Sequence, residues 1–278
     1  SFHFQSAANI QSLCKSMNTT SAESHPPTGA GGHRRFYRAA NAVRRILAVL
    51  FPKACPLCGK NTGTDAVYGI CAPCLRGARA AFPKQEECCR ICGQILVSER
   101  GICMNCRRRE TAAFDRVLAL YPYGGVYRSL LKAYKFGRYR ETGGFFVECL
   151  VRALSWMECQ TGVVVPTPPR EGKIKSTMWD QIEYLAALLE KKRGENPRIP
   201  AVYRCLKRFS SKTQKVLNRT ERATNLIGKI TVKAGFTAPE TAILIDDVYT
   251  TGATMNACAQ ALKQAGTKTV IGISLFYG

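Results

Sequence analysis

Residues 242–254, AILIDDVYTTGAT, decide the fold class of this chain. The four apolar residues that open the stretch form a short, bounded and partly β-branched run, which predicts a buried strand of a parallel sheet. A run of Thr, Gly and Ala follows at residues 250–254, and Met255, Ala259 and Leu262 then recur at helical spacing. The stretch therefore predicts a strand, a loop of small residues and a helix, in that order.

The polar residues of the same stretch indicate a ligand site. Backbone N–H groups in a small-residue loop at a helix N-terminus attract anions, most often phosphate. The candidate phosphate-binding residues are Thr250, Thr251, Gly252, Ala253 and Thr254. Asp246 and Asp247 precede this loop, and two adjacent carboxylates can hold neighbouring hydroxyls of a sugar. Diol acceptors followed by a phosphate loop describe a site for a ribose 5-phosphate.

A cysteine pattern occurs twice between residues 55 and 106. Each copy has two CxxC pairs, and glycine follows the first pair of each copy, where a tight turn requires a positive φ. Two such pairs close a tetrahedral four-thiolate zinc site at about 2.3 Å per bond. We therefore expect two structural zinc ions, held by Cys55, Cys58, Cys71, Cys74, Cys89, Cys92, Cys103 and Cys106.

Two alternatives to this metal assignment stay open at the level of sequence. The cysteines could form disulfides, but no secretory signal is evident and zinc is the favoured expectation. Pairs from different copies could also share one ion in a crossed arrangement. Cys88 adjoins a ligand and is expected to be spare. The remaining cysteines lack partners at ligand spacing and are expected to fill apolar space: Cys14, Cys149, Cys159, Cys205 and Cys258.

The composition favours a partner that carries negative charge. The formal net charge is +22, from 41 basic and 19 acidic residues, and such an excess is typical of proteins that bind polyanions. No apolar run approaches the roughly 20 residues that a bilayer-spanning helix needs, so no transmembrane segment is expected. With no evident secretory signal, the sequence predicts a cytoplasmic protein.

The chain is expected to have four parts. Residues 1–33 lack periodicity and are rich in Ser, Thr, Gly and Pro, which predicts a disordered tail. Residues 34–50 predict a basic amphipathic helix, which could lie on lipid or nucleic acid or, as we favour, pack its apolar stripe on the folded body. Residues 51–112 form the predicted double zinc-ribbon module, in which metal ligation supplies most of the folding energy. Residues 113–278 follow as the main domain.

This last part alternates between strand and helix patterns. Strands are predicted at residues 117–123, 163–166, 242–245 and 270–276, and helices at residues 126–136, 144–156 and 179–192. Such alternation predicts an α/β fold with a parallel sheet that is covered by helices on both faces. Ligands of these sheets bind beyond the carboxyl ends of the strands, where residues 246–254 would lie.

A family resemblance rests on these motifs. The stretch at residues 242–254 resembles the PRPP-binding signature of type I phosphoribosyltransferases at every class-defining position. Zinc-binding pairs ahead of such a signature resemble the ComF family of competence-associated bacterial proteins, from about Leu50 to the C-terminus. Segments at residues 123–137, 165–168 and 213–225 are also similar to that family and appear in its order. The resemblance implies a phosphoribosyltransferase-like fold with a PRPP pocket.

The chain departs from the family pattern after residues 165–168. The family usually carries a basic RGFNQ-like string there, in a mobile loop that closes over pyrophosphate, whereas this chain has KSTMWDQ at residues 175–181. Trp179 and Gln181 match the pattern and the Arg-Gly pair is missing, which weakens the expectation of pyrophosphate chemistry more than that of phosphate binding. Purine-salvage members of the fold carry an Asp base where Thr250 stands, and a threonine cannot act as that base at neutral pH.

Two function classes are compatible with these features. The resemblance implies a role in DNA uptake during natural transformation, with PRPP or a nucleotide 5′-phosphate in the pocket, bound single-stranded DNA and a helicase-like competence partner. Aromatic residues among the cations could stack on bases, namely Tyr134, Phe136, Tyr203 and Phe209. A basic segment supports polyanion binding through Arg204, Lys207, Arg208, Lys212, Lys215, Arg219 and Arg222.

The alternative is an active, Mg²⁺-dependent phosphoribosyltransferase that transfers the ribosyl group of PRPP to an unknown, non-purine acceptor. Asp246 and Asp247 would then hold the ribose hydroxyls and Mg²⁺, and the loop at residues 250–254 would hold the 5-phosphate. Lys135 is the candidate cation that neutralises the leaving pyrophosphate, since charge neutralisation and positioning carry most of the rate of such a reaction. The sequence does not decide whether the chain is an enzyme.

Overall fold

The computed structural model describes residues 53–62, 65–107, 112–136, 139–157, 162–209 and 228–278. The predicted tail and basic helix, at residues 1–33 and 34–50, lie outside the described residues. All described residues belong to one compact unit, Phe51–Gly278. The predicted boundary between residues 112 and 113 falls inside this unit and stays a prediction.

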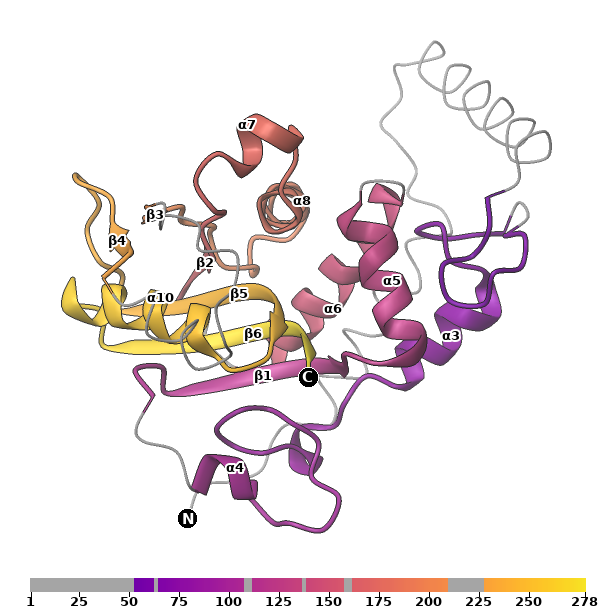
Figure 1. Cartoon of the computed structure of the whole chain (residues 1–278), viewed down its shortest axis with the longest axis horizontal. Helices are drawn as coiled ribbons and strands as arrows, with labels where there is room; N and C mark the ends of the chain where they lie inside the picture. Colours follow the sequence, from indigo (N-terminus) through magenta and orange to yellow (C-terminus); the bar gives the residue numbers. More distant parts are fainter. Residues whose placement is uncertain (1–52, 63–64, 108–111, 137–138, 158–161, 210–227) are drawn as a thin grey trace, which may run out of the picture. The chain divides into compact units, whose positions relative to one another are not determined.

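A four-stranded parallel sheet lies at the centre of the unit (Figure 1). Its strands lie in the order β1-β6-β5-β2, and every neighbouring pair is parallel. The strands are β1 (Arg116–Pro122), β2 (Val163–Pro166), β5 (Thr241–Tyr249) and β6 (Thr269–Tyr277). These bounds agree with the predicted strands to within one or two residues, except at the end of β5, and the predicted α/β class is confirmed.

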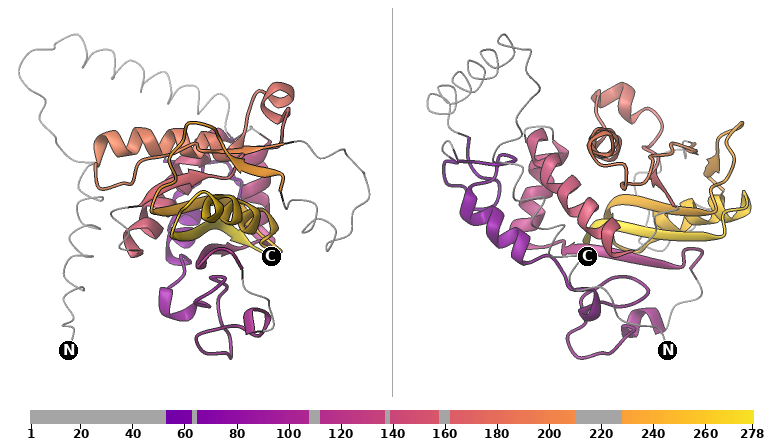
Figure 2. Two further views of the ribbon diagram at one scale, coloured as in Figure 1. Left: turned by 90° about the vertical axis from the view of Figure 1, so that its left-hand side faces the viewer. Right: turned by 180° about the vertical axis from the view of Figure 1, so that it is seen from behind.

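Helices cover both faces of the sheet (Figure 2). Among the described residues, the α-helices of the main domain are α5 (Gly125–Lys135), α6 (Gly143–Trp156), α7 (Lys173–Thr177), α8 (Gln181–Glu195) and α10 (Ala253–Gln264). A separate antiparallel ribbon pairs β3 (Leu206–Arg208) with β4 (Ile230–Val232). The sequence patterns did not predict α7 or this ribbon, because elements of three to five residues are too short to show a period.

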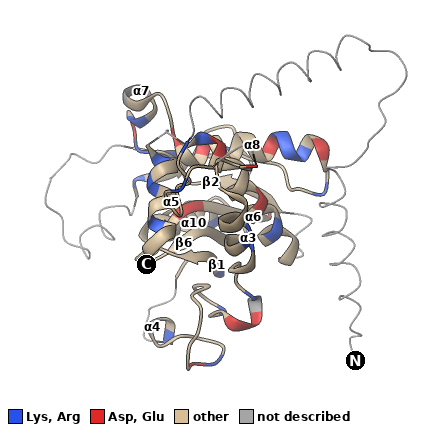
Figure 3. Cartoon of the chain, turned by 90° about the vertical axis from the view of Figure 1, so that its right-hand side faces the viewer, with Lys and Arg blue, Asp and Glu red and all other residues tan. Residues whose placement is uncertain are grey.

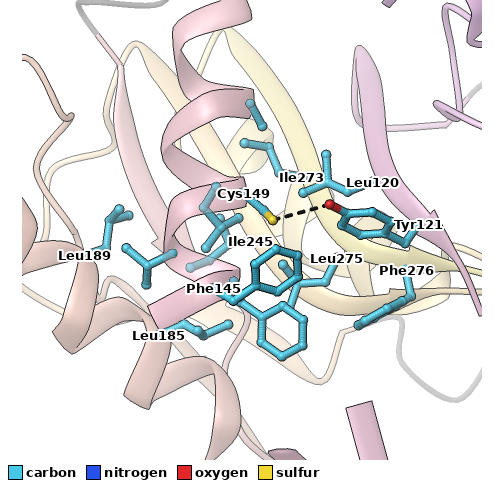
Figure 4. Close-up of a cluster of buried hydrophobic side chains, with 14 of the residues drawn as sticks. Leu120, Tyr121, Phe145, Cys149, Leu185, Leu189, Ile245, Ile273, Leu275 and Phe276 are labelled. Carbon is cyan, nitrogen blue, oxygen red and sulfur yellow. Dashed lines mark hydrogen bonds between the residues drawn. The ribbon is translucent and has the colours of Figure 1, made fainter. Parts of the chain in front are cut away.

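Alternation along β5 divides the core into two clusters. Ile243 and Ile245 belong to the cluster that contains residues of α6 and α8, which Figure 4 shows around Phe145 and Cys149. Ala242 and Leu244 belong to the cluster that contains residues of α10. Successive side chains of a strand point to opposite faces, so a fully apolar strand is the expected consequence of covering both faces.

Helix α8 begins two residues later than the sequence pattern indicates. Asp180 is its N-cap, and Oδ1 of Asp180 accepts hydrogen bonds from the backbone N–H groups of Ile182 at 2.9 Å and Glu183 at 3.1 Å. A capping aspartate satisfies helix amides that otherwise lack a partner and fixes where the helix starts. Trp179 therefore lies in the loop that follows α7, and Gln181 is the first residue of α8.

The first zinc ribbon shares its core with the sheet domain. Helix α3 (Ala72–Ala80) places Leu75 and Ala78 in the same buried cluster as the residues of α6. The Tyr121 hydroxyl, on β1, donates a hydrogen bond to the carbonyl of Ala78 at 2.9 Å. Arg79 forms two hydrogen bonds of 2.7 Å with the carboxylate of Glu148 on α6. Apolar packing, hydrogen bonds and an ion pair therefore attach this ribbon to β1 and α6, in addition to the cysteines that organise it.

The second zinc ribbon, which includes α4 (Met104–Arg107), covers the edge of the sheet at β1. The backbone N–H of Val117 donates to the carbonyl of Ile91 at 2.6 Å. A Cβ atom at Gly93 would lie 2.6 Å from the carbonyl oxygen of Val117, and φ of Gly93 is +70°. Only glycine allows this approach, and the contact satisfies part of an edge strand that would otherwise be open to other chains. Across the described residues, none of the helices is both long and apolar enough to cross a bilayer.

Candidate functional site

The candidate site lies where β5 ends and α10 begins. Strand β5 does not stop after Ile245, as the apolar run predicts, but continues to Tyr249, and Asp246 is paired in register with Ser274 of β6. The predicted end of the strand was therefore wrong by four residues, because backbone pairing with β6 continues through the polar positions. The two aspartates are consecutive residues of the strand, so their side chains leave it toward opposite faces. Both lie past the last pair of β2 with β5, Pro166 with Ile245, at the edge of the sheet where ligands of parallel sheets bind.

The loop from Thr250 to Gly252 leads directly into α10 (Figure 1). Gly252 is the N-cap residue, with φ +75°, and as a glycine it has no side chain to cap the helix. A Cβ atom at Gly252 would lie 2.8 Å from the hydroxyl oxygen of Tyr249. The hydroxyl of Thr251 accepts a 3.3 Å hydrogen bond from the backbone N–H of Ala253. The structure thus places a glycine turn and the N-terminus of a helix directly after the strand that carries the aspartates, an arrangement that suits an anion.

Asp246 is held through one of its two carboxylate oxygens. Oδ1 accepts hydrogen bonds from the backbone N–H of Asp247 at 2.9 Å and from the hydroxyl of Thr167 at 3.1 Å. Burial and the neighbouring carboxylate of Asp247 raise the pKa of Asp246 to about 7, against the lowering effect of these hydrogen bonds. A carboxyl group in this environment is costly to ionise until a cation or a set of hydroxyl donors approaches it.

Asp247 is held through Oδ2, whereas Asp246 is held through Oδ1. Oδ2 lies 2.6 Å from Nζ of Lys135, at the end of α5, and accepts a 2.6 Å hydrogen bond from Nε2 of Gln181. The side chain of Asp247 is only 12% exposed, and that of Lys135 is 35% exposed. The structure therefore brings Lys135, which the sequence predicts as the pyrophosphate-binding cation, into direct contact with a predicted ribose-binding residue.

The two carboxylates share a feature that bears on ligand binding. Each has one oxygen fixed by protein donors, whereas within the described part of the chain Oδ2 of Asp246 and Oδ1 of Asp247 accept no hydrogen bond. Fixed carboxylates that each retain an acceptor can bind hydroxyl groups or a hard cation without losing side-chain entropy on binding. The donor set is all oxygen, which is the set that Mg²⁺ prefers.

The sequence patterns predict no role for two residues of this site. Thr167 belongs to the strand-end motif at residues 165–168 and Gln181 matches the family loop, but neither pattern predicts a contact with the aspartates. Their polar side chains follow β2 and begin α8, and the carboxyl end of β2 adjoins that of β5 in the sheet. The position of Thr167 directly after a strand that neighbours β5 could have indicated its contact with Asp246. Gln181 gave no such signal, because its contact with Asp247 depends on where α8 begins.

The two cysteine tetrads have the geometry of zinc sites. Their sulfur atoms lie within 4.8 Å of one another in each set, Cys55, Cys58, Cys71 and Cys74 in the first and Cys89, Cys92, Cys103 and Cys106 in the second. Sγ of Cys58 lies 3.7 Å from that of Cys71, and the corresponding separation in the second set is also 3.7 Å. A tetrahedron with Zn–S bonds of about 2.3 Å has edges of about 3.8 Å. Both tetrads therefore fit zinc, and the crossed arrangement is wrong.

The first cysteine of each tetrad is predisposed to ionise. Burial acts to raise the pKa of Cys55, but hydrogen bonds from the backbone of Cys71, Cys58 and Leu57 outweigh it and lower the pKa to about 7. Cys89 repeats this balance in the second tetrad, where the backbone N–H of Cys103 donates to its sulfur at 3.3 Å. Amide donors around a thiolate favour the form that binds zinc.

The described cysteines outside the tetrads are placed as expected. Cys88 is buried, belongs to neither tetrad, and its thiol donates to the carbonyl of Lys84 at 3.3 Å. Cys149, Cys205 and Cys258 are buried among apolar side chains. Every described cysteine is a free thiol, and Cys14 and Cys159 lie outside the described residues.

The predicted nucleic-acid-binding residues are placed only in part. Lys207 and Phe209 are exposed at the β3–β4 ribbon, and the ammonium of Lys207 lies 4.9 Å from the centre of the Phe209 ring. Tyr134 is fully buried, so the expectation that it stacks on bases is wrong; its hydroxyl donates to the carbonyl of Gln181 instead. The other cations of this basic segment, Lys212, Lys215, Arg219 and Arg222, lie outside the described residues.

Charge near the acids comes from several elements of the fold. Burial and the nearby guanidinium of Arg170 lower the pKa of Arg208, on β3, while the carboxylate of Asp246 acts in the opposite direction. In the part of the chain that the structure describes, the Arg208 side chain forms no hydrogen bond or ion pair. Helix α8 carries both acidic and basic residues (Figure 3). Arg204, unlike Arg208, is already paired with two carboxylates of that helix, Glu183 and Glu190. Arg208 is therefore better placed than Arg204 to bind an anionic ligand.

Comparison with known proteins adds two findings. Residues 46–108 match the model of the double zinc ribbon domain, which covers both tetrads. The chain is also similar to Competence protein ComFC of Streptococcus pneumoniae, with 28% identity over 238 residues, covering 80% of this chain and 98% of that protein. The zinc-ribbon prediction is thereby supported by the family match and by the geometry of the sulfur atoms.

Proposed function

We propose that this chain acts in DNA uptake as a protein of the ComF family, with a pocket for PRPP or a nucleotide 5′-phosphate and a surface for single-stranded DNA. The double zinc ribbon and the similarity to Competence protein ComFC support the family assignment. The observation that carries the pocket is the sequence of groups along one strand end. Asp246 and Asp247 are fixed there, and each keeps one oxygen that accepts no hydrogen bond from the described residues. The glycine turn at Gly252 and the start of α10 follow directly in the chain.

In this pocket different groups of the chain bind different parts of the ligand. Asp246 and Asp247 bind the ribose hydroxyls and any Mg²⁺ that accompanies PRPP, which would neutralise charge on the pyrophosphate. The backbone amides of residues 250–254 bind the 5-phosphate at the start of α10. Lys135 is close enough to Asp247 to exchange that ion pair for one with a ligand phosphate.

The DNA proposal rests on charge and on the ribbon. The net charge is +22, and Lys207 and Phe209 offer a cation beside an exposed ring at β3. Cations that track a phosphate backbone and rings that stack on bases are the usual components of a single-strand site. The eight zinc-binding thiols must stay reduced, which suits the cytoplasmic face of an uptake system.

A catalytic phosphoribosyltransferase is the second candidate. The observation in its favour is the contact of Lys135 with Asp247, since a cation at that position would stabilise a departing pyrophosphate. The acceptor would be a non-purine, because Thr250 occupies the position of the base. Pyrophosphate release from PRPP in the presence of candidate acceptors distinguishes this enzyme from a protein that only binds PRPP.

Calorimetric titration with PRPP and Mg²⁺ tests the pocket. The unaltered protein should bind, and Gly252→Val should abolish binding, because the positive φ and the contact with Tyr249 leave no room for a side chain. Gly194→Val is the matched control, since a Cβ atom at this exposed helical glycine meets nothing within 4 Å. Asp247→Asn provides a second variant of unchanged shape. PRPP affinity that survives both site changes would rule out the pocket.

A further inference from the structure

Gln181 lies within a continuous series of polar contacts that links the β2–α8 loop to the end of β5. Nζ of Lys173, the first residue of α7, lies 2.5 Å from Oδ2 of Asp180 and 2.5 Å from Oε1 of Gln181. Nε2 of Gln181 donates to Oδ2 of Asp247 at 2.6 Å, and the same oxygen contacts Lys135. The neutral amide of Gln181 thus lies between two ion pairs, Lys173 with Asp180 on one side and Lys135 with Asp247 on the other.

The chemistry of the neighbours fixes the orientation of the Gln181 amide. Lys173 can only donate hydrogen bonds and Asp247, when ionised, can only accept them. Rotating the amide by half a turn would place its NH₂ group against the ammonium of Lys173 and its oxygen against the carboxylate of Asp247, and both contacts would be repulsive. Lys173 therefore determines which end of Gln181 faces Asp247.

Lys173 is itself held by its ion pair with Asp180. Asp180 is 3% exposed at its side chain, and its other oxygen caps α8. The position of the Lys173 ammonium is thus tied to the start of the helix that carries Gln181. Gln181 in turn occupies Oδ2 of Asp247, so the oxygen that remains without a hydrogen bond among the described residues is Oδ1.

We propose that Gln181 is a positioning residue, which, oriented by Lys173, holds Asp247 so that its Oδ1 faces the ribose hydroxyls of the ligand. The inference rests on the proposed pocket. It gives a role to two residues between the end of β2 and the first turn of α8, Lys173 and Gln181, even though the Arg-Gly pair of the family pattern is missing from that segment. Gln181 touches Asp247 and not the ligand phosphate, so its effect is confined to recognition of the sugar.

This division predicts how two ligands respond to the same change. Ribose 5-phosphate uses both the aspartates and the phosphate loop, whereas inorganic phosphate uses the loop alone. Gln181→Ala should weaken ribose 5-phosphate binding about tenfold, the usual effect of losing one hydrogen bond to a charged group, and leave inorganic phosphate binding within about twofold. Gln181→Glu keeps the bulk but places a carboxylate against Asp247, and it should weaken ribose 5-phosphate more than Gln181→Ala does.

A double-mutant cycle tests whether Lys173 acts through Gln181. Lys173→Met should weaken ribose 5-phosphate binding when Gln181 is present and have little further effect in the Gln181→Ala background. Lys192→Met is the matched control, because it removes an exposed ion pair with Glu195 from α8, the helix that carries Gln181. Melting temperature and inorganic phosphate affinity, measured on each variant, exclude a loss of fold as the cause.

The outcomes separate the inference from the proposed pocket. Ribose 5-phosphate binding that is weakened by Gln181→Ala, weakened further by Gln181→Glu, and non-additive with Lys173→Met supports the positioning role. Binding that Gln181→Ala leaves unchanged, or additive losses in the cycle, would overturn the inference while the pocket stands. If the unaltered protein binds no ribose 5-phosphate, the pocket fails and the inference fails with it.

Discussion

The ammonium of Lys135 lies 2.6 Å from the carboxylate of Asp247, which joins the C-terminal end of α5 to the end of β5. Both groups are largely withdrawn from water, with 35% of the Lys135 side chain and 12% of the Asp247 side chain exposed. An ion pair in this position compensates a buried carboxylate when no ligand is bound. It also places a cation beside the site where a ligand phosphate would lie.

Lys135→Met should distinguish PRPP from ribose 5-phosphate. PRPP carries a pyrophosphate that competes for this ammonium and ribose 5-phosphate does not, so the change should lower PRPP affinity about tenfold or more and ribose 5-phosphate affinity far less. Calorimetry with both ligands provides the comparison. Lys132→Met, at an exposed lysine of the same helix turn, is the control. Equal losses for the two ligands would show that Lys135 serves only to hold Asp247.

Asp246→Asn should stabilise the ligand-free protein. Oδ1 of an asparagine can still accept the hydrogen bonds from Thr167 and from the backbone of Asp247, while the buried charge is removed. We expect a gain of ~2 kcal/mol at pH 8, equivalent to about 4–8 °C in melting temperature. The same change should weaken ribose 5-phosphate binding, because functional sites often keep a group that destabilises the free protein, here the carboxylate of Asp246. A lower melting temperature at pH 8 would contradict the assigned environment of Asp246.

This stabilisation should depend on pH in a defined direction. The pKa of Asp246 rises from its ordinary value of 3.8 to about 7 in the folded state, so the folded state holds more protons than the unfolded state between these values. The contribution of Asp246 to stability therefore falls as pH rises from about 4 to about 7. The advantage of Asp246→Asn should grow over that interval and vanish below it, as thermal denaturation without added metal would measure.

Much of the fold and part of the site follow from the sequence. The apolar run before Asp246 predicts β5, and Met255, Ala259 and Leu262 predict the buried face of α10, because each pattern matches the period of one element. The cysteine spacing predicts both tetrads, since two thiolates of one turn reach a single ion. In these cases the determining contacts are local in sequence.

The remaining features depend on contacts between distant segments. β5 extends to Tyr249 because β6 pairs with it there, which no local pattern reveals. Gln181 reaches Asp247 only because Asp180 sets the start of α8. The shared core of Leu75 and α6 is invisible in the cysteine-rich segment, where few apolar residues are present. Long-range pairing and helix placement thus determine the parts that sequence reasoning missed.

Metal analysis should find two zinc ions per chain. Cys58→Ser should leave one, and it should lower the melting temperature of the whole Phe51–Gly278 unit by about 10 °C or more, because Leu75 and Ala78 of this ribbon lie in the core that contains α6. Cys88→Ser is the control: it should keep both ions, since its thiol contacts only the carbonyl of Lys84 among the hydrogen bonds described. A single ion in the unaltered protein would refute the assignment.

Single-stranded DNA binding should depend on the β3–β4 ribbon. Counterion release makes the logarithm of affinity fall with the logarithm of salt concentration, with a slope of about −0.7 per phosphate contacted. Lys207→Glu combined with Arg208→Glu should weaken binding and flatten that slope, as measured by fluorescence anisotropy over a salt series. Lys191→Glu with Lys192→Glu makes the same change in net charge on α8 and should have a smaller effect. Equal effects of the two pairs would mean that net charge alone, not the ribbon, determines DNA binding.

A crystal structure of the protein with ribose 5-phosphate tests the central proposal most directly, because it locates the phosphate and the sugar independently of affinity. We expect the 5-phosphate within hydrogen-bond distance of the backbone N–H groups of residues 250–254, and the ribose hydroxyls on Oδ2 of Asp246 and Oδ1 of Asp247. Gln181 and Lys135 should still face Asp247. Density for the ligand at any other position, with this loop empty at saturating ligand, would contradict the account.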